Sequence, residues 1–151
     1  MKQKFFPTLI EGIRNSFDEY ATLTFLEVGN EKKTYREMKA DCTELANCIL
    51  EKTDLSEKFI GVFAYRSKTA YAGIYGTILA GRAYLPLNPR FPKERLKKII
   101  KLGKIKTLIL GEECGEAFTQ FAREIDSLKI ICSLPDRIFE HVLRALLAWR
   151  I

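Results

Sequence analysis

The stretch that decides the fold is Leu79–Arg95, LAGRAYLPLNPRFPKER. Gly81 follows an apolar helical run, and a glycine there predicts a left-handed residue that ends the helix. Residues 84–87 read as a short strand, in which Pro86 predicts a strand end, an edge or a bulge. Asn88-Pro89 is typical of a turn before a new helix. The stretch therefore predicts a helix end, a strand, a turn and a helix start in close succession.

The residues around this stretch predict a longer alternation of strands and helices. Phe59–Tyr65 predicts a strand covered on both faces, because it shows little polar alternation. Ser67 is placed to cap the helix that follows. Further strands are expected at 83–87, 107–110 and 128–132, and helices at 68–80, 92–102 and 113–125. Units of this kind predict an α/β fold, with a largely parallel sheet flanked by helices.

The N-terminal part predicts a helix, a β-hairpin and a second helix. Thr8 and Glu11 have capping-box spacing, and residues 22–28 and 31–35 read as two strands. A second capping box, Thr34 with Glu37, opens the next helix. Apolar stripes are expected on both helices, at Leu9, Ile10, Ile13 and Phe17 and at Met38, Cys42, Leu45, Ala46, Ile49 and Leu50.

Two of these segments resemble motifs of one enzyme family. Leu79–Arg95 closely resembles the "LKAGxAYVPIDPxYPxER" signature of adenylate-forming enzymes, above all the amino-acid adenylation domains of peptide synthetases. Lys33–Met38, KTYREM, is similar to the "LTYxEL" motif of the same family. Asn88 stands where the common form has aspartate, which removes a charge and keeps the turn chemistry. The resemblance covers about residues 8–133 and matches only the beginning of a family member.

The resemblance implies how the chain is organised. Residues 1–135 are expected to form the N-terminal segment of an AMP-binding large domain, an incomplete portion of an adenylation-domain fold. Residues 136–151 do not match the family and predict an apolar amphipathic tail helix.

The resemblance also implies a chemistry. Adenylate-forming enzymes activate a carboxylate with ATP and Mg²⁺ and then pass the acyl group to a thiol, such as that of a phosphopantetheine carrier. Most hold the phosphates with a "TSGTTGxPKG" loop, and this sequence contains neither that loop nor the later adenine, ribose and lysine motifs. Charge that develops at the α-phosphate then has nothing to stabilise it. We therefore assign no catalytic, cofactor-binding or metal-binding residue and expect a truncated AMP-dependent ligase that is inactive alone.

Two other functions fit the same residues. One is a non-catalytic interaction module that pairs with a carrier protein or with a separately encoded remainder of the enzyme. Self-association is a related expectation, because an incomplete sheet leaves edges and faces uncovered. The other is an unrelated α/β binding protein, since short motifs recur by chance.

Other candidate chemistries are weaker. Gly76–Ala83 has the spacing of a phosphate-binding P-loop but lacks its lysine and hydroxyl residue, and its interior is apolar and helix-forming. His141 has no nucleophile in an elbow motif to serve, so it is expected to be an ordinary helical residue. Glu112-Glu113 with Glu116 predicts a helix start rather than paired catalytic carboxylates.

The four cysteines lack the spacing of a zinc site, and with a single histidine in the chain they predict no metal centre. They are Cys42, Cys48, Cys114 and Cys132, and all four are expected to be reduced thiols of a cytoplasmic protein.

The net charge of +6 comes from residues 90–106, which hold eight basic residues and one acidic residue. Pro92 suits the first turn of a helix there, and four apolar residues predict a buried face: Leu96, Ile99, Ile100 and Leu102. The charged side carries no interleaved aromatics, so it predicts a solvated or protein-facing surface rather than a nucleic-acid site. An N-terminal signal peptide and an apolar run of membrane-spanning length are absent from the sequence, which predicts no membrane partner.

Overall fold

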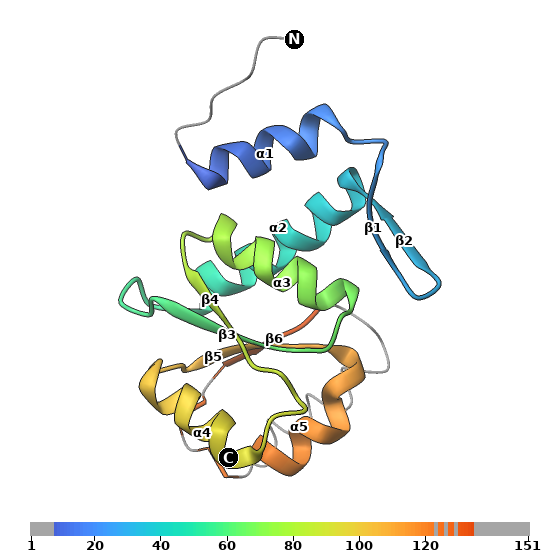
Figure 1. Cartoon of the computed structure of the whole chain (residues 1–151). Coiled ribbons are helices and arrows are strands. Elements are labelled where there is room, and N and C mark those ends of the chain that lie inside the picture. The colour runs from blue at the N-terminus through green and yellow to red at the C-terminus, as the bar shows by residue number, and fades with distance from the viewer. Residues whose placement is uncertain (1–7, 123, 126, 129, 135–151) are drawn as a thin grey trace.

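The computed structural model describes residues 8–122, 124–125, 127–128 and 130–134 (Figure 1). The predicted tail helix, residues 136–151, and His141 lie outside the described residues. The described chain forms a two-stranded antiparallel sheet and a four-stranded parallel sheet with helices on both faces. The α/β fold expected from the sequence is therefore confirmed.

The N-terminal part folds as the capping signals predict. Helix α1 (Leu9–Glu19) begins after Thr8, whose hydroxyl accepts a hydrogen bond from the Glu11 amide. Strands β1 (Thr24–Val28) and β2 (Glu31–Thr34) form the hairpin, and helix α2 (Tyr35–Lys52) follows. Two stripe assignments are wrong: the side chains of Leu9 and Leu50 are 67% and 50% exposed. Both lie at the margin of a stripe, where the periodicity does not show how far the neighbouring element extends.

The parallel sheet has the strand order β4-β3-β5-β6. Its elements in chain order are β3 (Phe59–Phe63), α3 (Lys68–Leu79), β4 (Ala83–Pro86), α4 (Lys93–Leu102), β5 (Thr107–Leu110), the 3₁₀ turn η1 (Glu112–Cys114), α5 (Gly115–Ala122) and β6 (Ile130–Cys132). The chain passes from β3 to β4 on one side, and then returns past β3 to β5 and β6. This reversal is a topological switch point between β3 and β5.

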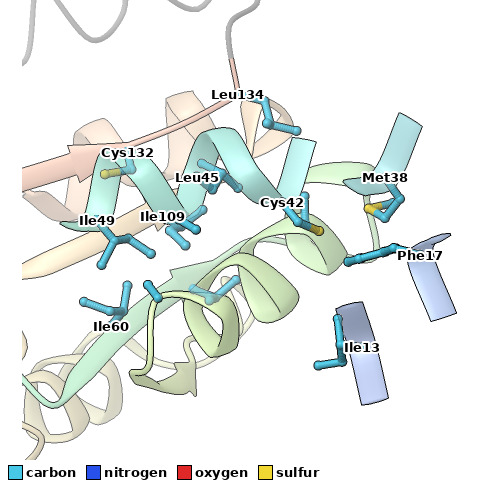
Figure 2. Packing of buried hydrophobic residues seen from close by; sticks show 14 residues of the cluster. Ile13, Phe17, Met38, Cys42, Leu45, Ile49, Ile60, Ile109, Cys132 and Leu134 are labelled. Carbon is cyan, nitrogen blue, oxygen red and sulfur yellow. The ribbon is translucent and has the colours of Figure 1, made fainter. Parts of the chain in front are cut away.

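Helices cover both faces of this sheet. Figure 1 shows α2 and α3 on one face, with α1 stacked beyond them, and α4 and α5 on the other. Each face has its own buried apolar cluster, and Figure 2 shows the first of them, around Leu45, Ile49 and Ile109. The second cluster centres on Phe63, Leu96 and Phe118. The central strands β3 and β5 are therefore apolar on both faces, as their sequence predicts.

The deciding stretch behaves largely as predicted. Gly81 has φ of 70° directly after α3, so it ends the helix in the left-handed region. Pro86 is the last residue of β4, which is an edge strand of the sheet, so its missing N–H costs no ladder bond. Pro92 occupies the N-cap position of α4, one residue before the predicted first turn.

A buried carboxylate fixes the start of β5. Glu57, which precedes β3, is 8% exposed. Its Oε1 accepts hydrogen bonds from the amides of Lys106 (3.0 Å) and Thr107 (2.7 Å), and its Oε2 accepts one from the Thr107 hydroxyl (3.0 Å). The two bonds to Thr107 satisfy donors that would otherwise be buried without partners.

Candidate functional site

The carboxyl edge of the parallel sheet is where the geometry concentrates polar groups. Parallel strands place their carboxyl ends at one edge, and open α/β sheets bind ligands outside that edge. The residues after β3 and β4 and the first turns of α3 enclose a cavity of about 580 Å³. It is lined by Val62, Ala64, Tyr65, Arg66, Ala70, Tyr71, Ile74, Pro86, Leu87, Asn88 and Arg90.

The cavity combines an apolar floor with two cations. Val62 and Leu87 are buried beneath it, whereas Arg66 and Arg90 are exposed. Among the described residues, the ion pairs include neither of these guanidinium groups. The Arg90 guanidinium carbon lies 5.6 Å from the centre of the Tyr65 ring, within cation–π range. This arrangement suits an organic anion that has an apolar body.

The turn after β4 positions Arg90. The side-chain Oδ1 of Asn88 accepts a hydrogen bond of 2.9 Å from the Arg90 amide, and the Asn88 carbonyl accepts one of 2.9 Å from the Phe91 amide. Asparagine stabilises such a turn by bonding the backbone two residues ahead. Asn88 therefore keeps the turn chemistry predicted for it, and its hydrogen bond fixes the backbone that carries the Arg90 side chain.

Glu113, just after β5, binds the chain that leaves β3. Its Oε1 accepts a hydrogen bond of 2.8 Å from the Tyr65 amide, at the end of β3. The chain passes close to this carboxylate at Gly111, where an added Cβ would lie 2.6 Å from Oε1. The predicted helix start is confirmed, because Glu112 and Glu113 lie in η1 and Glu116 lies in the first turn of α5.

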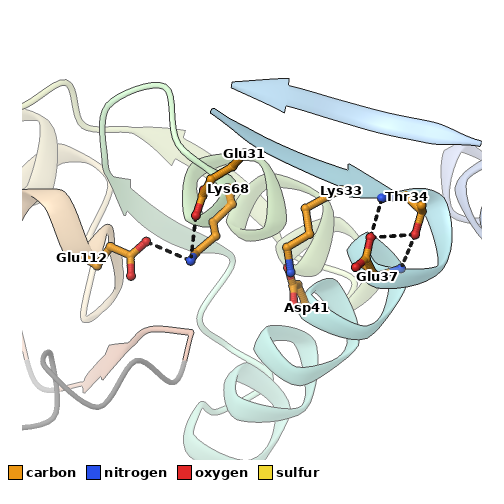
Figure 3. Close-up of polar contacts among 7 residues, drawn as sticks. All are labelled: Glu31, Lys33, Thr34, Glu37, Asp41, Lys68 and Glu112. Carbon is orange, nitrogen blue, oxygen red and sulfur yellow. Dashed lines mark hydrogen bonds and ion pairs between the residues drawn. The ribbon is translucent and has the colours of Figure 1, made fainter. Parts of the chain in front are cut away.

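Lys68 ties the hairpin to the same edge of the sheet. Its Nζ lies 3.4 Å from a Glu31 carboxylate oxygen and 3.2 Å from a Glu112 carboxylate oxygen (Figure 3). Burial disfavours the charged amine, but the hydrogen bond and charge of Glu112, together with Glu31, outweigh it and raise the Lys68 pKa. In this cluster one amine is paired with two carboxylates, so the three side chains form a structural contact rather than a group of free catalytic side chains.

The Lys33–Met38 motif has a structural role in this fold. The Thr34 amide donates to Glu37 Oε2 at 2.8 Å, and the Glu37 amide donates to the Thr34 hydroxyl at 3.3 Å (Figure 3). The hydrogen bonds from the Thr34 backbone and hydroxyl lower the Glu37 pKa. Nearby, Lys33 and Asp41 form an ion pair at 3.0 Å without hydrogen-bond geometry. Met38 is fully buried, so the motif starts α2 and anchors it.

The P-loop-like stretch Gly76–Ala83 does not form a phosphate cradle. Its first four residues belong to α3, and the amides that follow are already used. The Ala80 amide donates to the Gly76 carbonyl, that of Gly81 to Ile78, and that of Arg82 to Thr77. Amides paired in this way are not available to phosphate oxygens.

The cysteines differ from their prediction. The structure joins Cys48 of α2 to Cys132 of β6 in a disulfide, so the expectation of four reduced thiols is wrong for these two. The pair is 84 residues apart in the sequence, and spacing alone carries no signal for it. Cys42 and Cys114 are free and buried, and desolvation raises the pKa of each thiol to about 12. Among the described residues, histidine, cysteine and carboxylate side chains nowhere gather in threes as metal ligands.

The basic helix α4 buries Leu96 and Ile100, as predicted, and its lysines are exposed except Lys97, which is half-buried. Leu102 is 74% exposed, which corrects the prediction that it completes the buried face. It is the last residue of α4, and the chain turns away at Gly103 toward β5. Lys93 and Lys97 both pair with Glu124, which neutralises part of the charged face. Within the described part of the chain, each helix is too short or too polar to span a bilayer.

Comparisons with known proteins agree with this architecture. The family model of AMP-binding enzymes matches residues 13–143 and so reaches into the segment that the sequence motifs left unmatched. Bacitracin synthase 3 of Bacillus licheniformis is 34% identical over 93 residues, which are 59% of this chain and 2% of that protein. Bacitracin synthase 1 of the same organism is 30% identical over 127 residues, 83% of this chain and 2% of that protein.

Solved structures show the same fold. The Vibrio cholerae adenylation domain AlmE, in complex with glycyl-adenosine-5'-phosphate, superposes with a TM-score of 0.77 at 21% identity, over 96% of this chain and 27% of that one. The anthranilate CoA ligase AuaEII, in complex with anthranoyl-AMP, gives a TM-score of 0.74 at 14% identity, over 95% and 28%. The chain thus spans a small part of the relatives that it matches. On the family match over residues 13–143, the chain belongs to the AMP-binding enzymes, the adenylate-forming ligases.

Proposed function

We propose that this chain builds a structural part of a carboxylate-activating ligase and that, taken alone, it forms no acyl-adenylate. One observation carries the proposal: the backbone amides of the P-loop-like stretch are hydrogen-bonded within α3 and its end. The sequence also contains no Ser/Thr/Gly-rich loop that ends in lysine. Transfer at the α-phosphate needs such preorganised donors and a cation. In this proposal the chain is a structural part of a cytoplasmic ligase, and the remainder of that ligase provides the phosphate-binding donors and the cation.

ATP–pyrophosphate exchange tests this proposal. The purified chain is assayed with a panel of amino acids and fatty acids, and exchange is expected to stay at the level of the no-carboxylate control. A longer chimaeric chain, which adds the missing loop and lysine from a relative, should restore carboxylate-dependent exchange. The proposal is abandoned if the chain alone shows carboxylate-dependent exchange that survives repurification.

The proposed partner surface includes the open edge of the sheet. Among the described strands, β4 pairs only with β3, so its other edge offers unpaired backbone groups. Tyr84 of this strand and Phe59 beside it are exposed aromatic residues. We expect the remainder of the ligase, or a second copy of the chain, to cover this edge. Light scattering measures whether the chain associates with itself. A compact, monodisperse monomer at all concentrations would exclude self-association.

A second candidate function is favoured by the cavity at the carboxyl edge. Its apolar floor and the unpaired guanidinium groups of Arg66 and Arg90 suit the phosphopantetheine arm of a carrier protein, which joins an extended organic chain to a phosphate. In this role the chain acts as an interaction module that holds the arm without reacting with it.

Ligand titration followed by NMR distinguishes this role. Phosphopantetheine should shift the amides of residues 65, 66, 88 and 90, whereas pantetheine without the phosphate should bind at least about tenfold more weakly. Arg90→Gln should weaken the phosphate form selectively. Lys101→Gln, on α4 and outside the cavity, is the matched control for charge and should bind like the unchanged chain. Equal affinity for both ligands would exclude the cavity as a phosphate site.

A further inference from the structure

The disulfide pair joins the shortest strand of the parallel sheet to the helix layer above it. Cys132 is the last residue of β6, a three-residue strand, and Cys48 lies in the C-terminal half of α2. Their Cα atoms are 6.5 Å apart, inside the range that a disulfide requires. Among the described strands, β6 pairs only with β5. The bond is thus a second attachment for a strand that has little hydrogen bonding of its own.

The pair covers part of the apolar cluster between α2 and the sheet. Figure 2 shows Cys132 next to Leu45, Ile49 and Ile109, and these neighbours are fully buried. Leu134, two residues beyond β6, is buried in the same cluster. Release of β6 from α2 would therefore open this side of the cluster to water, and the hydrophobic effect opposes that opening.

The two sulfurs differ in access. Cys132 is buried, whereas Cys48 is half-buried and can meet a small thiol or disulfide from solution. The other two cysteines are buried on either side of the sheet, and burial raises the pKa of both thiols. Since the thiolate is the reactive form, Cys42 and Cys114 do not compete in exchange.

We propose that Cys48 and Cys132 form a reversible thiol–disulfide switch that controls how firmly β6 is held on α2. Glutathione disulfide is the oxidant: the Cys48 thiolate attacks one of its sulfurs and releases one glutathione thiolate. The Cys132 thiolate then attacks the Cys48 sulfur, forms the internal disulfide and releases the second glutathione. Two electrons pass from the protein to the oxidant, and the two thiol protons end on two glutathione molecules. Reduced glutathione reverses both steps.

The reduced form keeps the fold and loosens its outer strand. The described core on β3 and β5 does not depend on the bond, because those strands pair with each other and are covered by helices on both faces. The strand β6 depends on it more, because among the described elements it pairs only with β5 and has its main helix contacts with α2. Reduction is therefore expected to change local opening at β6 rather than global unfolding.

Alkylation of the whole chain gives the first test. The protein is equilibrated at a series of glutathione ratios, acid-quenched, unfolded and alkylated, and its intact mass is measured. Two of the four thiols should react at the oxidised end and all four at the reduced end, and peptide mapping should give the Cys48–Cys132 pair. Four reactive thiols at every ratio, or a different pair, would overturn the proposal.

Hydrogen exchange gives the second test and links the bond to the strand. Reduction should speed exchange of the β6 amides by about tenfold or more and leave those of β3 unchanged. In Cys48→Ser the β6 amides should exchange fast at both ends of the series. Cys114→Ala keeps the pair, lies on the other face of the sheet and should retain the redox response. A disulfide that forms without any change in β6 exchange would show that it is not a switch for this strand.

Discussion

The two faces of the parallel sheet are covered in different ways. On the α2–α3 face, the backbones of the two helices come close: a Cβ added at Gly76 would lie 2.8 Å from the Cys42 carbonyl oxygen. On the α4–α5 face, α4 begins without a side-chain cap, and Lys93 and Lys97 reach Glu124 by their flexible ends. The close backbone approach on the α2–α3 face leaves little room for larger side chains, whereas the side chains on the α4–α5 face can shift to accommodate a change. Substitutions should therefore cost more on the α2–α3 face, even though both faces bury apolar side chains.

The largest effect is expected at Phe17, the centre of the ring cluster that joins α1 to this face. Its ring lies 5.8 Å from that of Phe25 and 6.3 Å from that of Tyr75, and it is 2% exposed. Phe17→Ala should lower the free energy of unfolding by about 3–5 kcal/mol, measured by urea denaturation.

The matched control is Tyr20→Ala, at the end of the same helix. Tyr20 is 41% exposed, and its ring contact among the described residues is with Tyr35, at the edge of the cluster. Its loss should be about 1 kcal/mol. Equal losses at the two positions would contradict the view that the ring cluster fixes α1.

The second prediction concerns the close approach of α2 and α3. Gly76→Ala forces a methyl group against a backbone oxygen, which cannot rotate away, so the helices must separate. The unfolding free energy should fall by about 1–3 kcal/mol, although alanine favours a helix more than glycine does. Gly73→Ala is the control in the same helix, because its methyl group would meet side-chain carbons of Ile109 at 3.1 and 3.3 Å. A smaller loss is expected there, since a side chain can shift.

Local chemistry made much of this fold predictable. Thr8, Thr34 and Ser67 cap helices because a side-chain oxygen satisfies an amide only a few residues ahead. Gly81 was predictable as well, because the left-handed conformation that ends a helix depends only on the residues next to it. The exposed Leu50 and Leu102 were not, because periodicity finds the apolar side of a helix but not where its neighbour ends.

The site was less predictable than the fold. Tyr65, Arg66 and Arg90 were not identified as cavity residues. Tyr65 ends a predicted parallel strand, Arg66 and Arg90 follow predicted strands, and that position was the available signal. The disulfide gave no signal at all, because the pairing of residues 84 positions apart depends on where α2 crosses β6. Side chains brought together by topology are visible only once the strand order is known.

The third prediction tests a contact that belongs to neither helix layer. Glu57→Ala removes an acceptor shared by the amides of Lys106 and Thr107, and the Thr107 amide is left buried without a partner. The expected loss of unfolding free energy is about 1–3 kcal/mol. Glu57→Gln keeps an oxygen acceptor and should lose less. If both variants unfolded at the unchanged urea midpoint, the carboxylate would not hold β5.

The smallest effect is expected on the adjustable face, in the pairing of Lys97 with Glu124. The hydrogen bond and charge of Lys97 lower the Glu124 pKa, while the hydrogen bonds of Glu124 and Glu94 raise the Lys97 pKa. A lowered carboxyl pKa contributes stability above its unfolded value, and the contribution is lost as the pH falls through the folded pKa. A raised amine pKa contributes below its unfolded value, and this contribution is lost as the pH rises through the folded pKa. The ion pair is therefore intact at pH values between the Glu124 pKa and the Lys97 pKa, and it weakens below the first and above the second.

An NMR titration should find the Glu124 pKa below 4.5, and Lys97→Met should move it back toward that value. Lys98→Met removes a neighbouring charge that is in none of the ion pairs among the described residues, and it should leave the Glu124 pKa nearly unchanged. Equal shifts in the two variants would mean that Glu124 senses the general charge of α4, and then this face would hold its helix without any specific pair.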